Sequence, residues 1–224
     1  MTTLSTSAIG RMTILVFGAT GGTGQHFVAR ALADGHRIRA LVRNPSKMSS
    51  SSDNLDIREG SITDNVDMNS LVQGVTHVVV MLGDKEAQKT NKIVTAFIKK
   101  LVPAMRTQGV KRILYQAGGF SKPYGGELSW LLWLLRNTVV RAAGFEGQHQ
   151  DNESVMEYLA TEAKDLDWIV HRAGIGGDGP SKGVLDRSAT NFSVANHIDC
   201  AAYNLKILMD DSAIHTADFS WYGK

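Results

Sequence analysis

The sequence predicts a single α/β domain in which helices cover both faces of a doubly wound parallel sheet. Two observations predict this fold class. Strand-like segments alternate with helical segments along most of the chain, which is the pattern that parallel sheets require. An apolar strand at residues 14–17 also runs through a glycine-rich turn into an alanine-rich helix. The length of 224 residues and a hydrophobic content of 43% suffice for one core. We expect that domain over residues 12–224, after a flexible tail at residues 1–11 that is rich in Ser and Thr.

The expected strands are short runs rich in apolar residues, each bounded by turn or helix signals. They lie at residues 14–17, 37–42, 55–58, 76–82, 112–116, 168–172, about 192–194 and about 217–221. Residues 76–82 are almost continuously apolar, which is typical of a strand that is covered on both faces of a sheet.

The expected helices connect these strands. A long helix is predicted from about residue 86 to residue 108, because one apolar stripe recurs there at steps of four, at Ile93, Phe97, Leu101 and Met105. Pro103 is expected to bend or break this helix, and Gly109 to end it. Further helices are expected around residues 155–159 and from about residue 199 to 209.

The glycine-rich turn predicts a dinucleotide-binding domain of the Rossmann type. Glycines at this spacing let the strand turn sharply, let the backbone approach a pyrophosphate, and bring the helix close to the sheet. The N-terminus of the helix then offers free N–H groups to the phosphates. An ordinary glycine-rich turn is the alternative, and the order of strand, turn and helix disfavours it. The residues predicted to bind the cofactor here are Gly18, Thr20, Gly21, Gly22, Thr23 and Gly24.

The second expected strand ends in cations, at Arg43 and Lys47. A carboxylate at this place selects NAD through the ribose, whereas an Arg suits the 2′-phosphate of NADP. No acid follows Arg43 until Asp53. Because a guanidinium can hold a phosphate with two hydrogen bonds, the pattern predicts NADP(H) as the cofactor. The alternative is that both cations only face solvent, as surface Arg and Lys usually do.

Composition excludes several classes of protein. A net charge of +2 gives no basic surface for nucleic acid. The single cysteine, Cys200, is expected to be a buried structural thiol, and the seven histidines lack a metal-ligand spacing, so no metal site is predicted. The N-terminal residues lack the apolar core of a secretory signal, and the longest bulky apolar run, residues 130–135, is far too short to span a membrane. We therefore expect a soluble, cytoplasmic protein.

Five segments carry a family resemblance. They are Gly18–Gly24, Val42–Lys47, Glu59–Ile62, Met81–Gly83 and Gly109–Arg112. Their order along the chain resembles that of the atypical short-chain dehydrogenases, and is most similar to the NAD(P)H-binding flavin reductase and biliverdin-IXβ reductase (NmrA-like) group. The resemblance covers nearly the whole chain and implies a reductase.

The resemblance also implies further contacts with the cofactor. Ser61 and Ile62 would lie beside the adenine, and Met81, Leu82 and Gly83 beside the adenosine and the bridging part of the cofactor. An Asp commonly stands in the family where this chain has Ser61, and a serine hydroxyl bonds adenine less firmly.

The catalytic positions of related enzymes have no equivalent side chains here. Ordinary short-chain dehydrogenases use a Tyr-x-x-x-Lys pair to donate a proton, and this chain has no such pair. Where the resemblance places a Ser after the fifth strand and a His after the sixth, the chain has Gly118 and Gly174. Both the substrate and the source of the proton are therefore left open by the sequence.

Four polar residues near predicted strand ends are candidates for direct involvement in catalysis: Gln116, Tyr124, His149 and Arg172. Open α/β sheets bind ligands at such ends. Each has an ordinary alternative, because Gln116 can anchor a loop, Tyr124 can cap a turn, His149 can be exposed to solvent, and Arg172 can pair with an acid.

Residues 120–150 match the family poorly and are expected to form a helical insertion. Within it, residues 130–135 comprise two Trp and four Leu, so a helix there has no polar face and needs a cover. A lid over a flat apolar substrate, a homodimer contact and extra core all remain open. Lid or core is favoured, because large exposed apolar patches are rare.

Three functions remain in view. The first is an NADPH-dependent oxidoreductase that transfers hydride to a flavin-like or other flat conjugated small molecule. The second is an NADP(H)-binding regulator or redox sensor without turnover, which the missing catalytic side chains favour. The third is a non-redox isomerase or dehydratase on the same fold.

Overall fold

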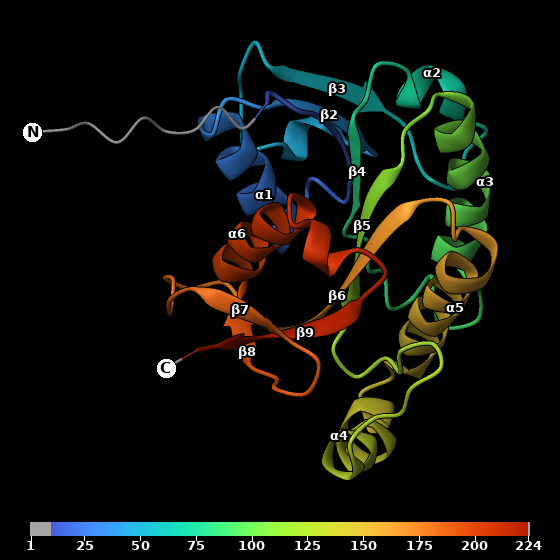
Figure 1. Ribbon diagram of the computed structural model, residues 1–224, viewed down its shortest axis with the longest axis vertical. Coiled ribbons are helices and arrows are strands. Elements are labelled where there is room, and N and C mark those ends of the chain that lie inside the picture. The colour runs from blue at the N-terminus through green and yellow to red at the C-terminus, as the bar shows by residue number, and fades with distance from the viewer. Residues whose placement is uncertain (1–9, 224) are drawn as a thin grey trace, which may run out of the picture.

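The computed structural model describes residues 10–223, and its centre is one twisted sheet with helices on either side (Figure 1). Residues 1–9 of the expected tail lie outside the described residues; Gly10 and Arg11 precede the first strand without regular structure. The strands are β1 Thr13–Phe17, β2 Arg37–Val42, β3 Leu55–Glu59, β4 His77–Val80, β5 Arg112–Gly118, β6 Asp167–Gly177, β7 Leu185–Ser188, β8 Val194–Asn196 and β9 Ala217–Tyr222. The α-helices are α1 Gly22–Ala33, α2 Met68–Val72, α3 Ile93–Thr107, α4 Trp130–Leu135, α5 Glu146–Glu162 and α6 His197–Leu208. A π-helical turn at Arg136–Val140 continues α4, and short 3₁₀ turns span Pro45–Lys47 and Asp211–Ala213.

The strand order is β3-β2-β1-β4-β5-β6-β9-β7, and β8 pairs with β6 beyond this path. Every pair is parallel except β7 with β9, so the sheet carries one antiparallel edge strand that the sequence did not predict. The chain winds outward from β1 in one direction and from β4 in the other, and the doubly wound fold class is thereby confirmed. In such sheets the crevice at the carboxyl ends of the two strands where the order reverses is the usual ligand site.

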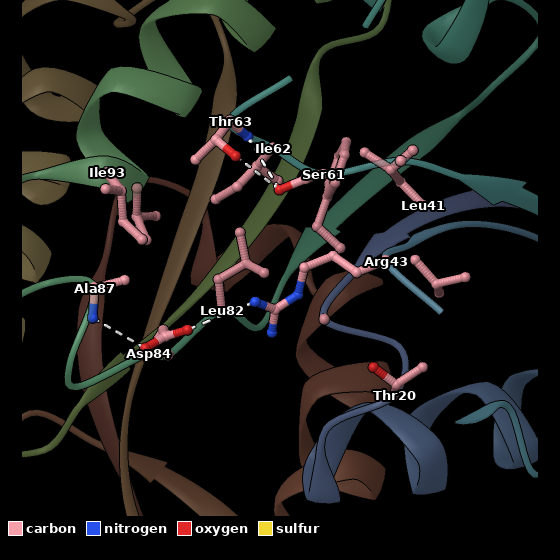
Figure 2. Close-up of a pocket in the computed structure, with 16 residues that line it drawn as sticks. Thr20, Leu41, Arg43, Ser61, Ile62, Thr63, Leu82, Asp84, Ala87 and Ile93 are labelled. Carbon is pink, nitrogen blue, oxygen red and sulfur yellow. Dashed lines mark hydrogen bonds and ion pairs between the residues drawn. The ribbon is translucent and has the colours of Figure 1, made fainter. Parts of the chain in front are cut away.

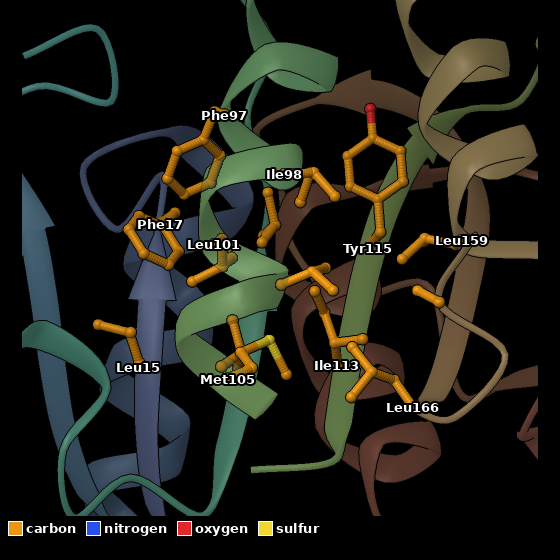
Figure 3. Close-up of a cluster of buried hydrophobic side chains, with 14 of the residues drawn as sticks. Leu15, Phe17, Phe97, Ile98, Leu101, Met105, Ile113, Tyr115, Leu159 and Leu166 are labelled. Atoms are coloured by element: carbon orange, nitrogen blue, oxygen red, sulfur yellow. The ribbon is translucent and has the colours of Figure 1, made fainter. Parts of the chain in front are cut away.

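Alternate residues of the central strands enter two separate cores. In β1, Leu15 and Phe17 face the core beneath α2, α3 and α5, whereas Ile14 and Val16 face the core beneath α1 and α6. This period of two is the geometry of a strand that is buried on both faces. Figure 3 shows the first core, in which the rings of Phe17 and Phe97 meet edge to face with 4.6 Å between centroids.

Helix α3 begins later than predicted. The stripe of Phe97, Leu101 and Met105 is buried as expected, but residues 86–90 form turns and residues 91–92 have no regular structure. The N-terminus of α3 lies against Asp151 of α5, whose carboxylate accepts the backbone N–H groups of Val94 at 3.0 Å and Thr95 at 2.9 Å. Pro103 lies inside the helix and does not end it.

Three further differences concern short elements. Helix α2 and strand β7 were not predicted, and β8 begins at Val194, where the predicted strand ended. Cys200 is completely buried in α6, as expected, and its burial raises the pKa of the thiol to about 12.

The segment after β5 contradicts the expectation of extra core. Trp130 and Trp133 are 76% and 57% exposed, and Leu132 is the one buried residue of α4. Figure 1 shows α4 projecting beyond the N-terminal end of α5, away from the sheet. The helix expected in this insertion is therefore present, but most of its apolar surface faces outward.

Candidate functional site

A continuous cleft lies where the strand order reverses, at the carboxyl ends of β1, β2, β4 and β5. It consists of two adjoining cavities of about 290 Å³ and 220 Å³, and Leu82 and Gly83 line both. The end of β2 forms part of the wall of the first cavity, and the end of β5 forms part of the wall of the second. Together they fall within the range of roughly 300–1,000 Å³ that is usual for ligand clefts.

The glycine-rich turn forms the middle of this cleft and depends on missing side chains. Gly18 has a φ of +87°, and a Cβ there would lie 2.1 Å from the carbonyl oxygen of Met81. A Cβ on Gly24 would lie 2.0 Å from the carbonyl oxygen of Gly18. The first turn of α1 therefore packs directly on the backbone of the loop, and the loop packs on the backbone at the end of β4. Gly21 is the N-cap and provides no side-chain cap, so N–H groups at this helix end are left for an anion.

Arg43 borders the first cavity at the end of β2, and Figure 2 shows its guanidinium directed toward Asp84. Nη1 of Arg43 lies 3.7 Å from the Asp84 carboxylate, and the Arg43 side chain is 76% exposed. The Asp84 carboxylate also accepts the N–H of Ala87 at 3.0 Å. The acid near Arg43 therefore comes from the loop after β4. Lys47 is exposed in a 3₁₀ turn and is not part of the cavity wall.

The opposite wall of the first cavity contains Ser61, Ile62 and Thr63. The hydroxyl groups of Ser61 and Thr63 are 2.9 Å apart, and the Ser61 N–H bonds the Asp64 carboxylate at 2.8 Å. Ser61 and Ile62 thus lie in the cleft with Leu82 and Gly83, as the resemblance implies for an adenine site. Met81 borders only the second cavity.

His197 is a cleft residue that the sequence did not reveal. It begins α6, and its Nδ1 lies 3.0 Å from Oγ1 of Thr23. A Cβ on Gly22 would lie 2.4 Å from Nε2 of the same ring. The imidazole therefore rests on the glycine turn, where a pyrophosphate would bind. No local pattern could have indicated this, because 174 residues separate His197 from Thr23.

The second cavity ends at Gln116, Gly118, Gln148, Asn152 and Ile175. Of the four catalytic candidates, Gln116 is therefore the one that lines the cleft. Its Oε1 accepts a hydrogen bond of 2.7 Å from Nδ2 of Asn204, which fixes the orientation of the amide. The amide donor of Gln116 is then directed away from Asn204.

His149 lies behind this wall and is buried, not exposed to solvent. A chain of hydrogen bonds connects its imidazole to β5. Tyr115 donates its hydroxyl to Oδ1 of Asn152 at 2.5 Å, and Nδ2 of Asn152 donates to Oγ of Ser121 at 3.1 Å. Oγ of Ser121 lies 2.9 Å from Nδ1 of His149 and completes the chain. Burial, aided by the positive charge of Arg136, lowers the pKa of His149 to about 4.

At the two glycines that stand in the expected catalytic positions, other side chains fill the space beside the backbone. A Cβ on Gly118 would lie 2.9 Å from Cε1 of His149, and one on Gly174 would lie 2.5 Å from the ring of Phe192. His149 and Phe192 therefore fill the space that a Ser and a His would need. The packing of His149 and Phe192 therefore requires glycine at both positions.

The remaining two candidates lie outside the cleft. The Nε of Arg172 donates to the carbonyl of Ala217 at 2.9 Å, and the guanidinium lies 3.7 Å from the centre of the Phe219 ring. Its burial lowers the pKa of Arg172 to about 10. Tyr124 is exposed and lines a separate groove with Lys92 and Glu157.

Residues 10–223 contain no group of three or more His, Cys, Asp or Glu side chains that could hold a metal ion. Within the same residues, every helix is too short or too polar to cross a membrane.

Comparisons with known proteins agree with this architecture. A family model described as NAD(P)H-binding matches residues 18–211. Among solved structures, the chain is similar to the oxidoreductase ylbE of Lactococcus lactis, with a TM-score of 0.75, 17% identity, and coverage of 95% of this chain and 92% of that chain. It is also similar to ChuY, an anaerobillin reductase of Escherichia coli O157:H7, with a TM-score of 0.73, 16% identity, and coverage of 93% and 96%. A short-chain dehydrogenase/reductase of Veillonella parvula has a TM-score of 0.71 and 16% identity, with coverage of 94% of both chains. At these identities the solved structures establish the fold.

Proposed function

Because the chain belongs to the NAD(P)H-binding family, we propose that it is an NADPH-dependent reductase that transfers hydride to a flavin-like or other flat conjugated small molecule. The observation that carries the proposal is the continuous cleft, in which the glycine turn lies between a wall bearing a cation and a wall of small and amide side chains. The reductase fold of ChuY, a protein described as acting on anaerobillin, supports a flat acceptor.

The residues of the cleft fit a dinucleotide. Gly21, Gly22 and Thr23 line the second cavity at the start of α1, where backbone N–H groups would meet a pyrophosphate. His197 would lie beside the same phosphates, and Ser61 and Ile62 beside the adenine. Arg43 would leave Asp84 and bind the 2′-phosphate, which makes NADP(H) the proposed form of the cofactor.

When bound, the reduced cofactor supplies the hydride. The chain supplies the position of the acceptor, because hydride transfer depends on close and aligned contact. Gln116 and Asn152 place amide groups at this end of the cleft, and Ile175 adds an apolar contact. With a pKa of about 4, His149 is neutral at physiological pH and does not deliver a proton as an imidazolium. The proton that completes the reduction comes from solvent in this proposal.

A second candidate function is an NADP(H)-binding regulator or redox sensor without turnover. The filling of the space at Gly118 and Gly174 by His149 and Phe192 favours it, because no side chain is then left at either position to assist chemistry. A non-redox isomerase or dehydratase is the third reading of the same cleft.

One experiment distinguishes these functions. NADPH is mixed with the protein and a panel of flavins, tetrapyrroles and quinones, and its oxidation is followed by absorbance. In parallel, NADPH binding is measured by titration calorimetry. Oxidation that exceeds the rate without protein supports the reductase, whereas tight binding without oxidation of any acceptor supports the sensor. The control is Gly24→Ala, in which the added Cβ would overlap the Gly18 carbonyl and should abolish both binding and oxidation.

A further inference from the structure

The exposed apolar surface of the insertion is not explained by the proposed function. Residues 130–142 form one helical segment, in which α4 continues through the π-helical turn. Five large side chains of this segment are exposed: Trp130, Leu131, Trp133, Leu134 and Val139. We call these five residues the tryptophan face. None of them lines either cavity of the cleft.

The tryptophan face is held firmly on the body of the protein. On the opposite side of the segment, Arg136 forms ion pairs with Glu153 and, at 3.1 Å, with Glu146, both from α5. Its guanidinium also donates to the Phe120 carbonyl at 3.3 Å, and the Arg136 side chain is 12% exposed. Leu132 is buried beside it. The ion pairs of Arg136 with α5 therefore fix the direction in which the tryptophan face points.

The charges around the face argue against a lipid surface. Residues 128–145 contain two cations and no acid, and one of those cations, Arg136, is already neutralised by two carboxylates. Arg141 is the other cation. Helices that bind anionic lipid carry several cations on the polar side, which this segment lacks. A nearly neutral apolar face fits a second protein surface of the same kind.

The exposed area is large enough for such a contact. A Trp side chain can bury up to about 250 Å², so Trp130 and Trp133, at 76% and 57% exposed, offer roughly 330 Å². The three exposed aliphatic side chains bring the tryptophan face to on the order of 500 Å² in each copy. Two copies would bury roughly 1,000 Å², which is about the smallest area of a specific protein interface. A patch of this size matches the largest apolar patch on a typical monomeric protein, and such patches often mark a site of interaction.

We propose that the tryptophan face is the contact through which two copies of this chain form a dimer, with the two helical segments antiparallel across a two-fold axis. In that arrangement the N-terminal flank of one segment faces the C-terminal flank of the other. Glu127, which is 82% exposed and lies 3.4 Å from Nζ of Lys122 in its own chain, then approaches Arg141 of the second copy. The two Arg141 side chains lie at opposite ends of the contact, so they do not repel one another.

The test is analytical ultracentrifugation of the full chain over a range of concentrations. The unmodified protein is expected to sediment as a species of twice 24.3 kDa. Trp130→Glu and Trp133→Glu should each weaken the dimer at least tenfold, because central Trp residues contribute strongly to interfaces. The matched control is Val184→Glu, which places the same charge at an apolar side chain that is 74% exposed outside the face, and should leave the dimer unchanged. Circular dichroism of each variant serves as the control for correct folding.

A charge exchange tests the antiparallel arrangement. Glu127→Arg alone and Arg141→Glu alone should each weaken association, and the double variant should restore it. A protein that stays monomeric at all concentrations overturns the proposal, as does a dimer that survives both Trp substitutions. Sedimentation of the monomer with phosphatidylcholine vesicles would assign the face to lipid instead. Failure of the charge exchange to restore association would refute the antiparallel arrangement.

Discussion

Replacing Arg43 with Ala should remove most of the preference of this protein for NADPH over NADH. A guanidinium that holds a phosphate makes charge-assisted hydrogen bonds, each of which contributes roughly 1.5–3 kcal/mol. Two such bonds would contribute more, but the Arg43 side chain is 76% exposed and solvent screens its charge. The net loss should therefore be about 1.5–3 kcal/mol, which is roughly a 10- to 150-fold weaker binding of NADPH. NADH affinity should scarcely change.

Asp84 provides the matched variant, because it competes with the phosphate for Arg43. At the observed 3.7 Å, two unit charges in water attract by about 1 kcal/mol. Asp84→Asn keeps an oxygen that can accept the Ala87 N–H but removes this competing charge. We therefore expect Asp84→Asn to bind NADPH up to about fivefold more tightly, since 1.4 kcal/mol corresponds to a factor of ~10.

The assay is calorimetric titration of both nucleotides into the three proteins at one salt concentration. Equal affinity of the unmodified protein for NADPH and NADH would falsify the role of Arg43. Binding of neither nucleotide would remove the proposed cofactor site altogether, and the glycine turn would then be a feature of the fold that serves another function.

Three further predictions concern stability and reactivity. Asp151→Asn should lower the free energy of unfolding by about 2–4 kcal/mol in urea denaturation, because an amide cannot accept all the bonds that now meet this carboxylate at the start of α3; a loss of only a few tenths would contradict this. Stability should also decrease as the pH falls from about 6.5 toward 4. Burial lowers the pKa of His149 and of His171 to about 4, so the unfolded chain takes up protons that the folded chain does not, at a cost of up to about 2 kcal/mol per ring at pH 5. Equal urea midpoints at pH 7 and pH 5 would be inconsistent with buried neutral rings. Cys200 should react with an aromatic disulfide reagent in denaturant but not in the folded protein, and rapid reaction in buffer would show that the thiol is accessible.

Local patterns were sufficient for the elements whose signals are contained in one short segment. The predicted bounds of β2 match the structure, and the stripe of Phe97, Leu101 and Met105 correctly indicated the buried side of α3. The start of α3 could not be predicted in the same way, because the carboxylate that satisfies its first N–H groups, Asp151, is 56 residues away from Thr95.

Some residues of the candidate site could be predicted from a local motif, and others could not. The glycine turn is a local motif, and its predicted geometry follows from the sequence. Asp84, His197 and Asn152 reach the cleft from three different loops or helices, so only the folded chain brings them to it. Tyr124 illustrates the opposite error, since a position after β5 does not ensure that a side chain turns toward the cleft.

The prediction of extra core at the apolar insertion was wrong for a physical reason. A helix without a polar face needs a cover; a lid or extra core was favoured from the sequence, with a homodimer contact as the alternative. The structure leaves Trp130 and Trp133 exposed. A single sequence carries no record of contacts between chains, so burial by a second copy cannot be separated from burial in a core.

The π-helical turn at residues 136–140 decides where the insertion can lose a residue without redirecting its apolar surface. A π turn holds one residue more than an α turn, and each residue of an α-helix is rotated by about 100° from the last. Deletion of one residue from the π turn would leave an ordinary α turn, so the side chains before and after it would keep nearly the same directions. Deletion of one residue from α4 would instead rotate the side chains before it by about 100° relative to Arg136. Over evolution, a codon lost from the π turn would leave this surface in place, whereas a codon lost from α4 would redirect it.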